Sequence, residues 1–501
     1  MRRLREIWRS WSVRRRLLVV GSACLVVAGG AVAAYLLVKR PDDKACPAPC
    51  SLHKTHEAEK APVKTVNWPV YGYDIARTRY LPSQRVHPPY EPSIWSFQAG
   101  RLLEFSPIIA DHFAYFMDKE ALFYALDDRT GKLVWKQDLG SLNATSPAFA
   151  HNRLYAATMQ PGQIAALDPA NGKVIWRHPL PDKSETSPVV FQNKVIVGCA
   201  CGTVYALDAK TGKTEWTVST GSPVKGGVAV DDGDVFFGNY GGQVYAVDAS
   251  DGHTKWTAQT QGGGFLQGGG VYSTPSVAFG RVFVGSLDGR VYSYEEHSGQ
   301  LQWSHSTGAE VYPGPAVADT PNSPPTVYIG SADKHFYALD ARTGEERWSH
   351  DVGGVVLGAA SVVGNTVYMS VIGPNVGTFG FNTDGGHQVF QNDVGEYNPV
   401  TSDSRRLYLT GESEVRAFRP EPPHPNQHKK GQGAHQKPSG QKGHGSQHKQ
   451  PGQGGQGAHK QSGQKGHGSQ HNQPGQGGHS AHKQSGHHAA QNKRGGSGKN
   501  S

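Results

Sequence analysis

The hydrophobic and polar positions of the chain repeat with a period of 40 to 47 residues. The unit is clearest in YALDAKTGKTEW, which ends at Trp216. It combines a short apolar run, an acidic residue, a turn that contains glycine, and an aromatic residue. In seven copies the glycine stands four residues before that aromatic residue, at Gly131, Gly172, Gly212, Gly252, Gly299, Gly344 and Gly386. A repeat of this length is typical of a propeller blade with four strands.

The spacing within the unit predicts a β-hairpin. Residues 204–207 form a strand with apolar side chains on both faces, so neighbouring sheets must cover it on both sides. Asp208 can accept hydrogen bonds from amides of the turn, and Gly212 supplies the positive φ that the turn requires. Trp216 follows on the next strand, where we expect it to pack between blades.

The two ends of the repeat array predict one further blade. Residues 94–97 read as an outer strand with no hairpin before it, and residues 407–409 and 415–418 read as strands that no aromatic strand follows. Pairing the Trp95 strand with these C-terminal strands completes an eighth blade and removes two exposed sheet edges. The sequence therefore predicts an all-β, eight-bladed propeller of four-stranded antiparallel blades over residues 67–420.

The repeat YALDxxTGxxxW resembles the PQQ-type repeat of quinoprotein dehydrogenases and of their non-enzymatic, BamB-like relatives. NWPVYGYDIARTRYLP, at residues 67–82, resembles the lead-in segment of the quinoprotein propellers. In those dehydrogenases an adjacent cysteine pair lies beside the quinone, whereas one residue separates Cys199 from Cys201 here. The glutamate and asparagine that bind calcium and the catalytic aspartate have no recognisable counterpart. The resemblance is therefore closer to the BamB-like members and implies no cofactor.

The net charge of +9 is unevenly distributed. Residues 1–61 hold 12 Lys and Arg against 5 Asp and Glu, and residues 421–501 hold 11 against 1, which leaves a charge of −8 for residues 62–420. The predicted propeller is thus acidic between two basic ends, and we expect no nucleic-acid partner.

The N-terminus predicts a membrane anchor. Residues 1–16 form a basic segment with seven arginines, and residues 17–38 carry no charge. As a helix, these 22 residues span about 33 Å, enough to cross a bilayer. The arginines favour a cytoplasmic N-terminus and an extracytoplasmic propeller at the plasma membrane. The alternatives are a signal peptide cleaved after Ala31-Val32-Ala33 and a lipoprotein modified at Cys24; we favour the uncleaved helix because apolar residues continue to Val38.

Two further segments flank the predicted propeller. Residues 39–66 read as a polar stalk, in which Cys46 and Cys50 can form a disulfide on the oxidising side of the membrane. Residues 421–501 form a duplicated tail rich in His, Gly, Gln and Lys, too poor in apolar residues to fold. The tail holds 12 of the 24 histidines, and it can bind transition metals weakly through residues such as His435, His444, His448, His459, His467 and His471. Its positive charge also suits anionic wall polymer.

Loops on one face of the propeller contain the candidate ligand-binding residues. Glu104, Glu185 and Glu396 each stand three residues before a proline that precedes an innermost strand, and Tyr272 takes the same place in another blade. Glu310, Tyr312 and Lys225 lie near it in others. This pattern predicts a partly acidic, aromatic mouth for a cation, a basic peptide or a polar ligand, although charged loops are also common on acidic domains.

The Cys199-Ala-Cys201 sequence lies in a loop on the same face. Two cysteines at this spacing can form a bridge or bind a soft metal, or they can simply pack in the turn. None of these three alternatives supplies a catalytic constellation. We therefore expect a membrane-anchored, non-enzymatic scaffold that binds cell-envelope proteins or wall polymer. The alternative is a quinoprotein oxidoreductase that uses PQQ and calcium.

Overall fold

The computed structural model describes residues 67–82, 88, 90–262, 269–373, 377–397 and 400–419. The expected membrane helix at 17–38, the stalk with Cys46 and Cys50, and the histidine-rich tail lie outside these residues. Within the part of the chain that is described, no helix is long and apolar enough to cross a bilayer.

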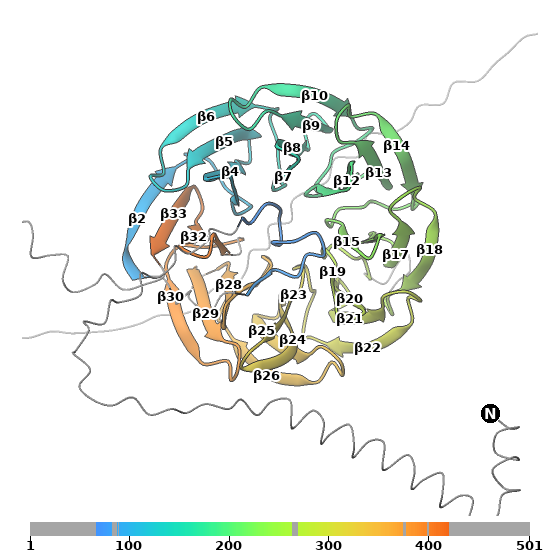
Figure 1. Cartoon of the computed structure of the whole chain (residues 1–501). Helices are drawn as coiled ribbons and strands as arrows, with labels where there is room; N and C mark the ends of the chain where they lie inside the picture. The colour runs from blue at the N-terminus through green and yellow to red at the C-terminus, as the bar shows by residue number, and fades with distance from the viewer. Residues whose placement is uncertain are drawn as a thin grey trace, which may run out of the picture. The chain divides into compact units, whose positions relative to one another are not determined.

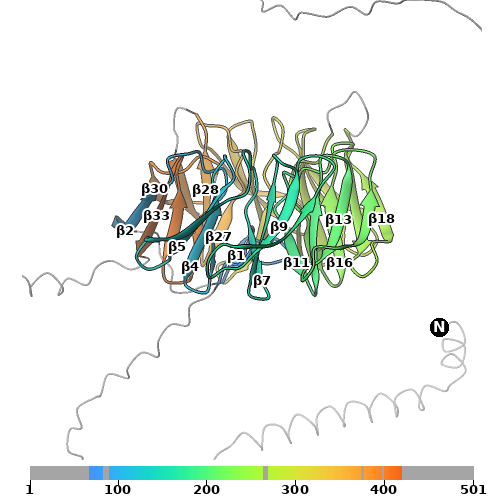
Figure 2. The same ribbon diagram turned by 90° about the horizontal axis from the view of Figure 1, so that it is seen from above.

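Eight antiparallel sheets of four strands surround a central axis, as predicted (Figure 1). Figure 2 shows the same blades from the side. Blades 1 to 4 contain β3 (Ile108–Ala110), β4 (Phe113–Met117), β5 (Leu122–Asp127) and β6 (Leu133–Asp138); β7 (Ala148–Ala150), β8 (Arg153–Thr158), β9 (Gln163–Leu167) and β10 (Val174–Pro179); β11 (Val189–Phe191), β12 (Lys194–Gly198), β13 (Thr203–Asp208) and β14 (Thr214–Ser219); and β15 (Ala229–Asp231), β16 (Asp234–Gly238), β17 (Gln243–Asp248) and β18 (Thr254–Gln259).

Blades 5 to 7 continue the series in chain order. They contain β19 (Ser276–Ala278), β20 (Arg281–Ser286), β21 (Arg290–Glu295) and β22 (Leu301–Ser306); β23 (Ala316–Thr320), β24 (Ser323–Gly330), β25 (His335–Asp340) and β26 (Glu346–Asp351); and β27 (Ser361–Val363), β28 (Thr366–Val371), β29 (Gly377–Asn382) and β30 (Gln388–Asn392). Blade 7 also receives β1 (Tyr80–Leu81), which pairs with β27 in parallel. That fifth strand departs from the predicted four.

Blade 8 closes the ring in the way that the sequence predicts. It joins β31 (Thr401–Ser402), β32 (Leu407–Thr410) and β33 (Glu414–Arg419) to the N-terminal β2 (Tyr90–Gln98). Trp95 on β2 lies opposite Ala417 on β33. Since the outermost strand of this blade comes from the other end of the array, the two ends hold each other in place.

The repeated tryptophan connects each blade to the next one. In blade 2, the Trp176 indole N–H donates to the Ala209 carbonyl of blade 3 at 3.2 Å. Gly212, with φ +72°, lies beneath the same ring, and a Cβ there would come within 2.6 Å of it. The same tryptophan-to-carbonyl bond recurs from Trp95, Trp135, Trp216, Trp256 and Trp303. The glycine is thus required both for its φ and for the space that it leaves to the ring.

The lead-in segment, residues 67–82, runs through the central channel (Figure 1). Its backbone exchanges hydrogen bonds with the innermost strands or neighbouring residues of blades 1, 2, 4, 5, 6 and 7; for example, Val230 N donates to Ile75 O and Val277 N to Ala76 O. These edge amides would otherwise face an open channel. The segment therefore fills the channel and forms a floor for one face.

Candidate binding pocket

A pocket of about 410 Å³ opens at the centre of one face. Every blade contributes the residue that stands four positions before its innermost strand, and we call this place the ring position. The ring residues are Glu104, Ala144, Glu185, Lys225, Tyr272, Tyr312, Leu357 and Tyr397. Tyr71 of the lead-in segment also lines the pocket, so the floor and the wall come from different parts of the chain.

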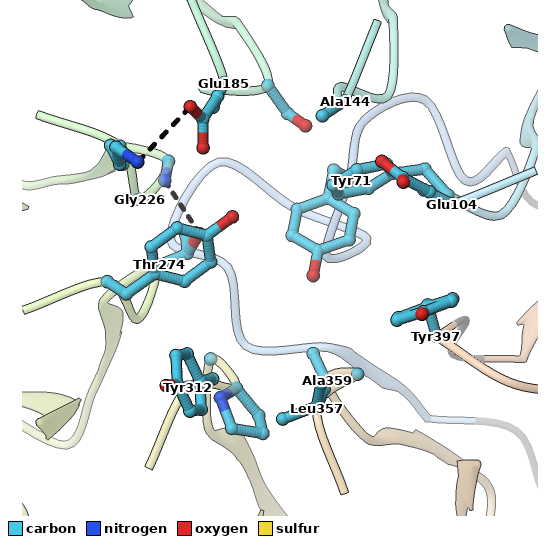
Figure 3. A pocket seen from close by; sticks show the side chains of 18 residues that line it. Tyr71, Glu104, Ala144, Glu185, Gly226, Thr274, Tyr312, Leu357, Ala359 and Tyr397 are labelled. Carbon is cyan, nitrogen blue, oxygen red and sulfur yellow. Dashed lines mark hydrogen bonds and ion pairs between the residues drawn. The ribbon is translucent and has the colours of Figure 1, made fainter. Parts of the chain in front are cut away.

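The ring position divides the pocket into two unlike halves. Blades 1 to 4 supply Glu104, Ala144, Glu185 and Lys225, whereas blades 5 to 8 supply Tyr272, Tyr312, Leu357 and Tyr397. Figure 3 shows the glutamates on one side, Tyr312, Leu357 and Tyr397 on the other, and the Tyr71 hydroxyl pointing into the space between them. The pocket can therefore hold a ligand with one polar and one apolar part.

Aromatic contacts fix the apolar half. The Tyr272 ring meets Tyr240 at 6.1 Å and Tyr312 at 6.0 Å between centroids, both edge to face. Burial and the nearby charge of Glu185 raise the pKa of Tyr272 and bring that of Tyr240 to about 12. These phenols therefore stay neutral near physiological pH, where they can donate a hydrogen bond.

The glutamates of the polar half are already paired with lysines. Glu104 lies 2.9 Å from the Lys119 ammonium, and Glu185 lies 3.1 Å from Lys183 and 3.4 Å from Lys225. Lys225 also lies 4.8 Å from the centroid of the Tyr240 ring. The acidic mouth expected from the sequence is thus neutralised locally by Lys225, which the sequence placed on this face, and by Lys119 and Lys183, which it did not.

Two buried arginines lie beneath the pocket. Arg77 and Arg79 are both 0% exposed. Arg77 donates to the carbonyls of Val228 at 2.8 Å and Ser187 at 3.0 Å, and also to Tyr71 O. The Tyr71 ring lies over both guanidinium groups, with its centroid 5.9 Å from Arg77 Cζ and 5.0 Å from Arg79 Cζ. Burial and the charge of Arg79 lower the pKa of Arg77 to about 9, so the Arg77 side chain remains cationic at neutral pH.

The structure brings five of the predicted face residues into this pocket. Glu104, Glu185, Lys225, Tyr272 and Tyr312 all line it. The predicted equivalence of Glu396 is wrong by one residue: Thr401 of β31 pairs with Tyr408 as Ile108 of β3 pairs with Tyr115, which puts Tyr397 at the ring position. Counting back from the proline fails in this blade because Val400, and not a proline, directly precedes β31.

Glu396 and Glu310 both lie away from the pocket lining. Glu396 borders a separate surface groove with Glu412, and burial together with the charge of Glu412 raises the pKa of Glu396. Glu310 lies two residues before Tyr312, and its backbone carbonyl accepts a hydrogen bond from Ala332 N at 3.0 Å. It therefore lies beside the ring position of blade 6 and not on the wall of the pocket.

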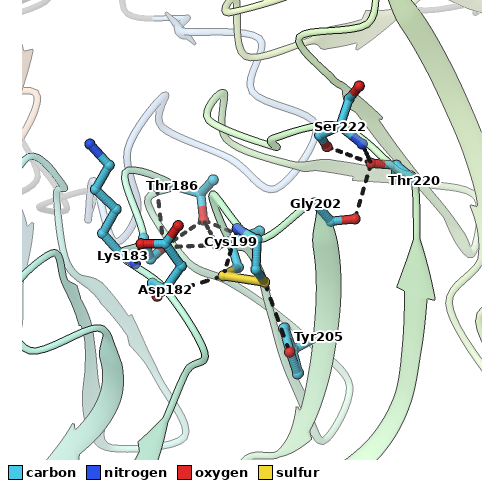
Figure 4. Close-up of a disulfide and its surroundings, with 11 residues drawn as sticks. Asp182, Lys183, Thr186, Cys199, Gly202, Tyr205, Thr220 and Ser222 are labelled. Carbon is cyan, nitrogen blue, oxygen red and sulfur yellow. Dashed lines mark hydrogen bonds between the residues drawn. A yellow bond between two sulfur atoms is a disulfide. The ribbon is translucent and has the colours of Figure 1, made fainter. Parts of the chain in front are cut away.

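Cys199 and Cys201 form a disulfide in the turn between β12 and β13 (Figure 4). Cys199 is fully buried, while Cys201 is exposed. The turn holds two segments that lead to ring residues, because Ala200 N donates to Lys183 O at 2.9 Å and Val224 N donates to Cys199 O at 3.2 Å. Asn239, Ser286 and Ser331 accept the corresponding bond in later blades. The pair thus supports the pocket wall without lining it.

Several residues of the pocket and of the layer beneath it were not predicted from the sequence. Placing Tyr397 and Leu357 at the ring position requires the register of the innermost strands. The degraded repeats of blades 7 and 8 obscure that register. Tyr71, Arg77 and Arg79 lie in the lead-in segment, which carries no repeat. The sequence did contain one sign of the buried charge: two arginines stand in a segment that the fold has to bury.

The described pocket residues do not fit a catalytic calcium ion. Calcium takes six to eight oxygen ligands, mostly from carboxylates and amides. The described lining holds two carboxylates, both paired with lysine, and no aspartate or asparagine. Among the described residues, three metal-ligating side chains gather only at Asp248, Asp251 and His253, on an outer hairpin turn away from this pocket. We therefore derive no reaction step through calcium or a quinone.

Comparisons with known proteins agree with the architecture. A family model described as outer membrane protein assembly factor BamB matches residues 118–223 and 200–421. BamB from Moraxella catarrhalis superposes with a TM-score of 0.56 at 18% identity, over 66% of this chain and 99% of that one. Quinohemoprotein alcohol dehydrogenase from Comamonas testosteroni superposes with a TM-score of 0.60 at 15% identity, over 72% and 82%. At these identities the likeness shows the fold alone.

One curated relative shares a short stretch of sequence. The 1-butanol dehydrogenase (cytochrome c) of Thauera butanivorans is 34% identical over 76 residues, which are 14% of this chain and 11% of that protein. The match thus spans about a tenth of the length of that relative, roughly two blades of the repeat.

Proposed function

Because the chain belongs to the family described as outer membrane protein assembly factor BamB, we propose that it is a non-enzymatic scaffold that binds a ligand or partner protein at its pocket face. The proposal extends to its place in the cell. The basic residues 1–16 and the uncharged residues 17–38 favour a membrane anchor, with the propeller outside the cytoplasm.

One observation carries the proposal: a single pocket gathers one side chain from every blade on a floor made by the chain itself. The backbone bonds of the lead-in segment fix that floor, and the paired glutamates and the tyrosine contacts fix the wall. A preorganised concave surface of this kind loses little entropy on binding. The ring residues differ from blade to blade, which gives the pocket a specific shape and polarity.

The expected partners are proteins of the cell envelope or anionic wall polymer. The net charge of +10 on residues 421–501 supports an electrostatic contact with such a polymer, and that contact should weaken with salt.

The test uses the full-length chain in detergent as bait for an envelope extract. We expect a retained component that is lost with Leu357→Arg, which places a charge in the apolar half, and kept with the matched change Leu301→Arg on the exposed outer strand β22. Equal retention by wild type and both variants would remove the pocket face from the proposal.

The quinoprotein alternative rests on the short match to 1-butanol dehydrogenase. It predicts that PQQ with Ca²⁺ binds the full-length chain, gives a bound quinone absorbance, and supports dye reduction with alcohols. We expect no Ca²⁺-dependent quinone absorbance and no dye reduction, because both described pocket carboxylates are held by lysines and do not offer a calcium site. A saturable quinone absorbance that depends on Glu185 would establish the alternative instead.

A further inference from the structure

The charges around the pocket favour an anion over a cation. The cationic residues near the pocket are Arg77, Arg79, Lys119, Lys183 and Lys225, and the carboxylates are Asp74, Glu104 and Glu185. Each pocket glutamate is already matched by at least one lysine. The two buried arginines therefore leave an excess of positive charge under the floor, in a setting where water screens it poorly.

Within the part of the chain that the structure describes, neither buried arginine has a carboxylate in direct contact. The hydrogen bonds of Arg77 go to backbone carbonyls, and Arg79 Nη1 donates to Arg77 O, Ser276 Oγ and Pro315 O. The oxygens of Asp74, the nearest acid, accept hydrogen bonds from Thr78. Burying guanidinium charges without an adjacent anion is costly, so an anion close to the floor would stabilise the arrangement.

One edge of Arg79 is unsatisfied and lies behind the lining residue Gly314. Its Nε and Nη2 atoms are buried and have no hydrogen-bond partner among the described residues. These two donors form the edge of a guanidinium that pairs with carboxylates in a two-pronged fashion. A Cβ on Gly314, which lines the pocket, would come within 2.5 Å of Nη2. The Tyr71 ring lies on the same guanidinium, with its hydroxyl in the pocket (Figure 3).

We propose that the pocket binds an organic carboxylate, with its anionic group at the Tyr71 hydroxyl above Arg79 and its apolar body against Tyr272, Tyr312, Leu357 and Tyr397. This inference rests on the proposed function and names the ligand class of the same pocket. In the sequence the glutamates suggest a cationic ligand, whereas this proposal assigns an anionic one. The carboxylate belongs either to a small molecule or to the C-terminus of a peptide, since both present the same group.

The first test compares three probes of similar size and different charge. Benzoate, benzamide and benzylammonium are titrated by calorimetry into the full-length chain in detergent. We expect saturable binding of benzoate and at least tenfold weaker binding of the other two. Equal affinities, or tighter binding of benzylammonium, would overturn the proposal.

Two variants locate the charge effect. Arg79→Gln should weaken benzoate at least tenfold and leave benzamide unchanged. Glu185→Gln removes a negative charge and should strengthen benzoate several-fold, so the proposal remains testable if Arg79→Gln fails to fold. Glu346→Gln makes the same charge change on the exposed outer strand β26 and should have no effect. Weaker benzoate binding in Glu185→Gln would contradict the assignment.

A second pair of probes separates the two sources of carboxylate. If the pocket recognises the C-terminal carboxylate of a peptide, acetyl-Ala-Phe with a free C-terminus binds more tightly than its amide. If benzoate binds and the peptide does not, the pocket is specific for small molecules. If every carboxylate fails while Leu357→Arg still abolishes retention of the envelope component, the anion assignment is wrong and the scaffold proposal stands.

Discussion

The outer rim and the ring position are two parts of one repeat that follow opposite rules. At the rim, seven blades repeat the same spacing of a polar residue, a glycine and an aromatic residue, and six tryptophans donate to a carbonyl of the next blade. At the ring position, the eight blades carry a mixture of glutamate, alanine, lysine, leucine and tyrosine. The rim shows how the fold is maintained, and the ring shows where the molecule can be specific.

The rim glycine should give the largest effect on stability. Gly212→Ala adds a Cβ within 2.6 Å of the Trp176 ring at a φ of +72°. We expect a loss of about 3 kcal/mol in the free energy of unfolding, measured with denaturant. Gly221 has a similar φ of +70° and nothing within 4 Å, so Gly221→Ala should cost about 1 kcal/mol. Equal losses would mean that packing against the tryptophan contributes nothing.

The buried arginine of the floor should come next. Arg77→Met removes the donors to Val228 O, Ser187 O and Tyr71 O and leaves these carbonyls unpaired inside the channel. We expect a loss of about 2 kcal/mol in the free energy of unfolding, because each unsatisfied group costs its desolvation. The exposed Arg342→Met serves as the control and should change stability by less than about 0.5 kcal/mol. A floor variant as stable as this control would show that the lead-in segment is not held by Arg77.

One rim turn should respond to pH. Glu296 takes the place that alanine has in blades 3, 4 and 6, and burial, followed by the charge of Asp231, raises its pKa from 4.5 to about 7. Between these values the folded protein holds a proton that the unfolded chain has released, so this contribution to stability falls as the pH rises from 4.5 to 7. We therefore expect the free energy of unfolding to fall across this window. Glu296→Gln should remove that slope in thermal unfolding curves; an unchanged slope would assign it to other groups.

The ring position should tolerate substitution best. Ala144 is half-buried at the polar side of the pocket. We expect Ala144→Ser to change the free energy of unfolding by less than about 0.5 kcal/mol, because the added hydroxyl faces the pocket. A loss as large as that of Gly212→Ala would show that the ring position is structural as well.

The same contrast explains how much could be predicted from the sequence. The spacing from Asp208 to Trp216 is set by local turn chemistry and repeated seven times, so it predicts blade number and ring closure. The ring position depends on strand register, which is readable where a proline directly precedes the innermost strand, as after Glu104 and Glu185. The register is misjudged at Glu396, because Val400 stands between the proline and β31 and shifts the pattern by one residue. The ion pair between Glu185 and Lys225 and the contacts of the buried arginines arise from long-range packing, which no local spacing encodes.

The most direct test of the division between rim and ring compares two residues that lie close in sequence. Trp303 belongs to the rim of blade 5, and Tyr312 occupies the ring position of blade 6. Unfolding free energy and benzoate affinity are measured on Trp303→Ala and Tyr312→Ala in the full-length chain. We expect Trp303→Ala to lose about 3 kcal/mol of stability with the affinity of the folded protein unchanged, and Tyr312→Ala to lose less than about 1 kcal/mol and at least tenfold in affinity. If Trp303→Ala weakens binding while Tyr312→Ala leaves it intact, the rim and the ring do not divide fold from function.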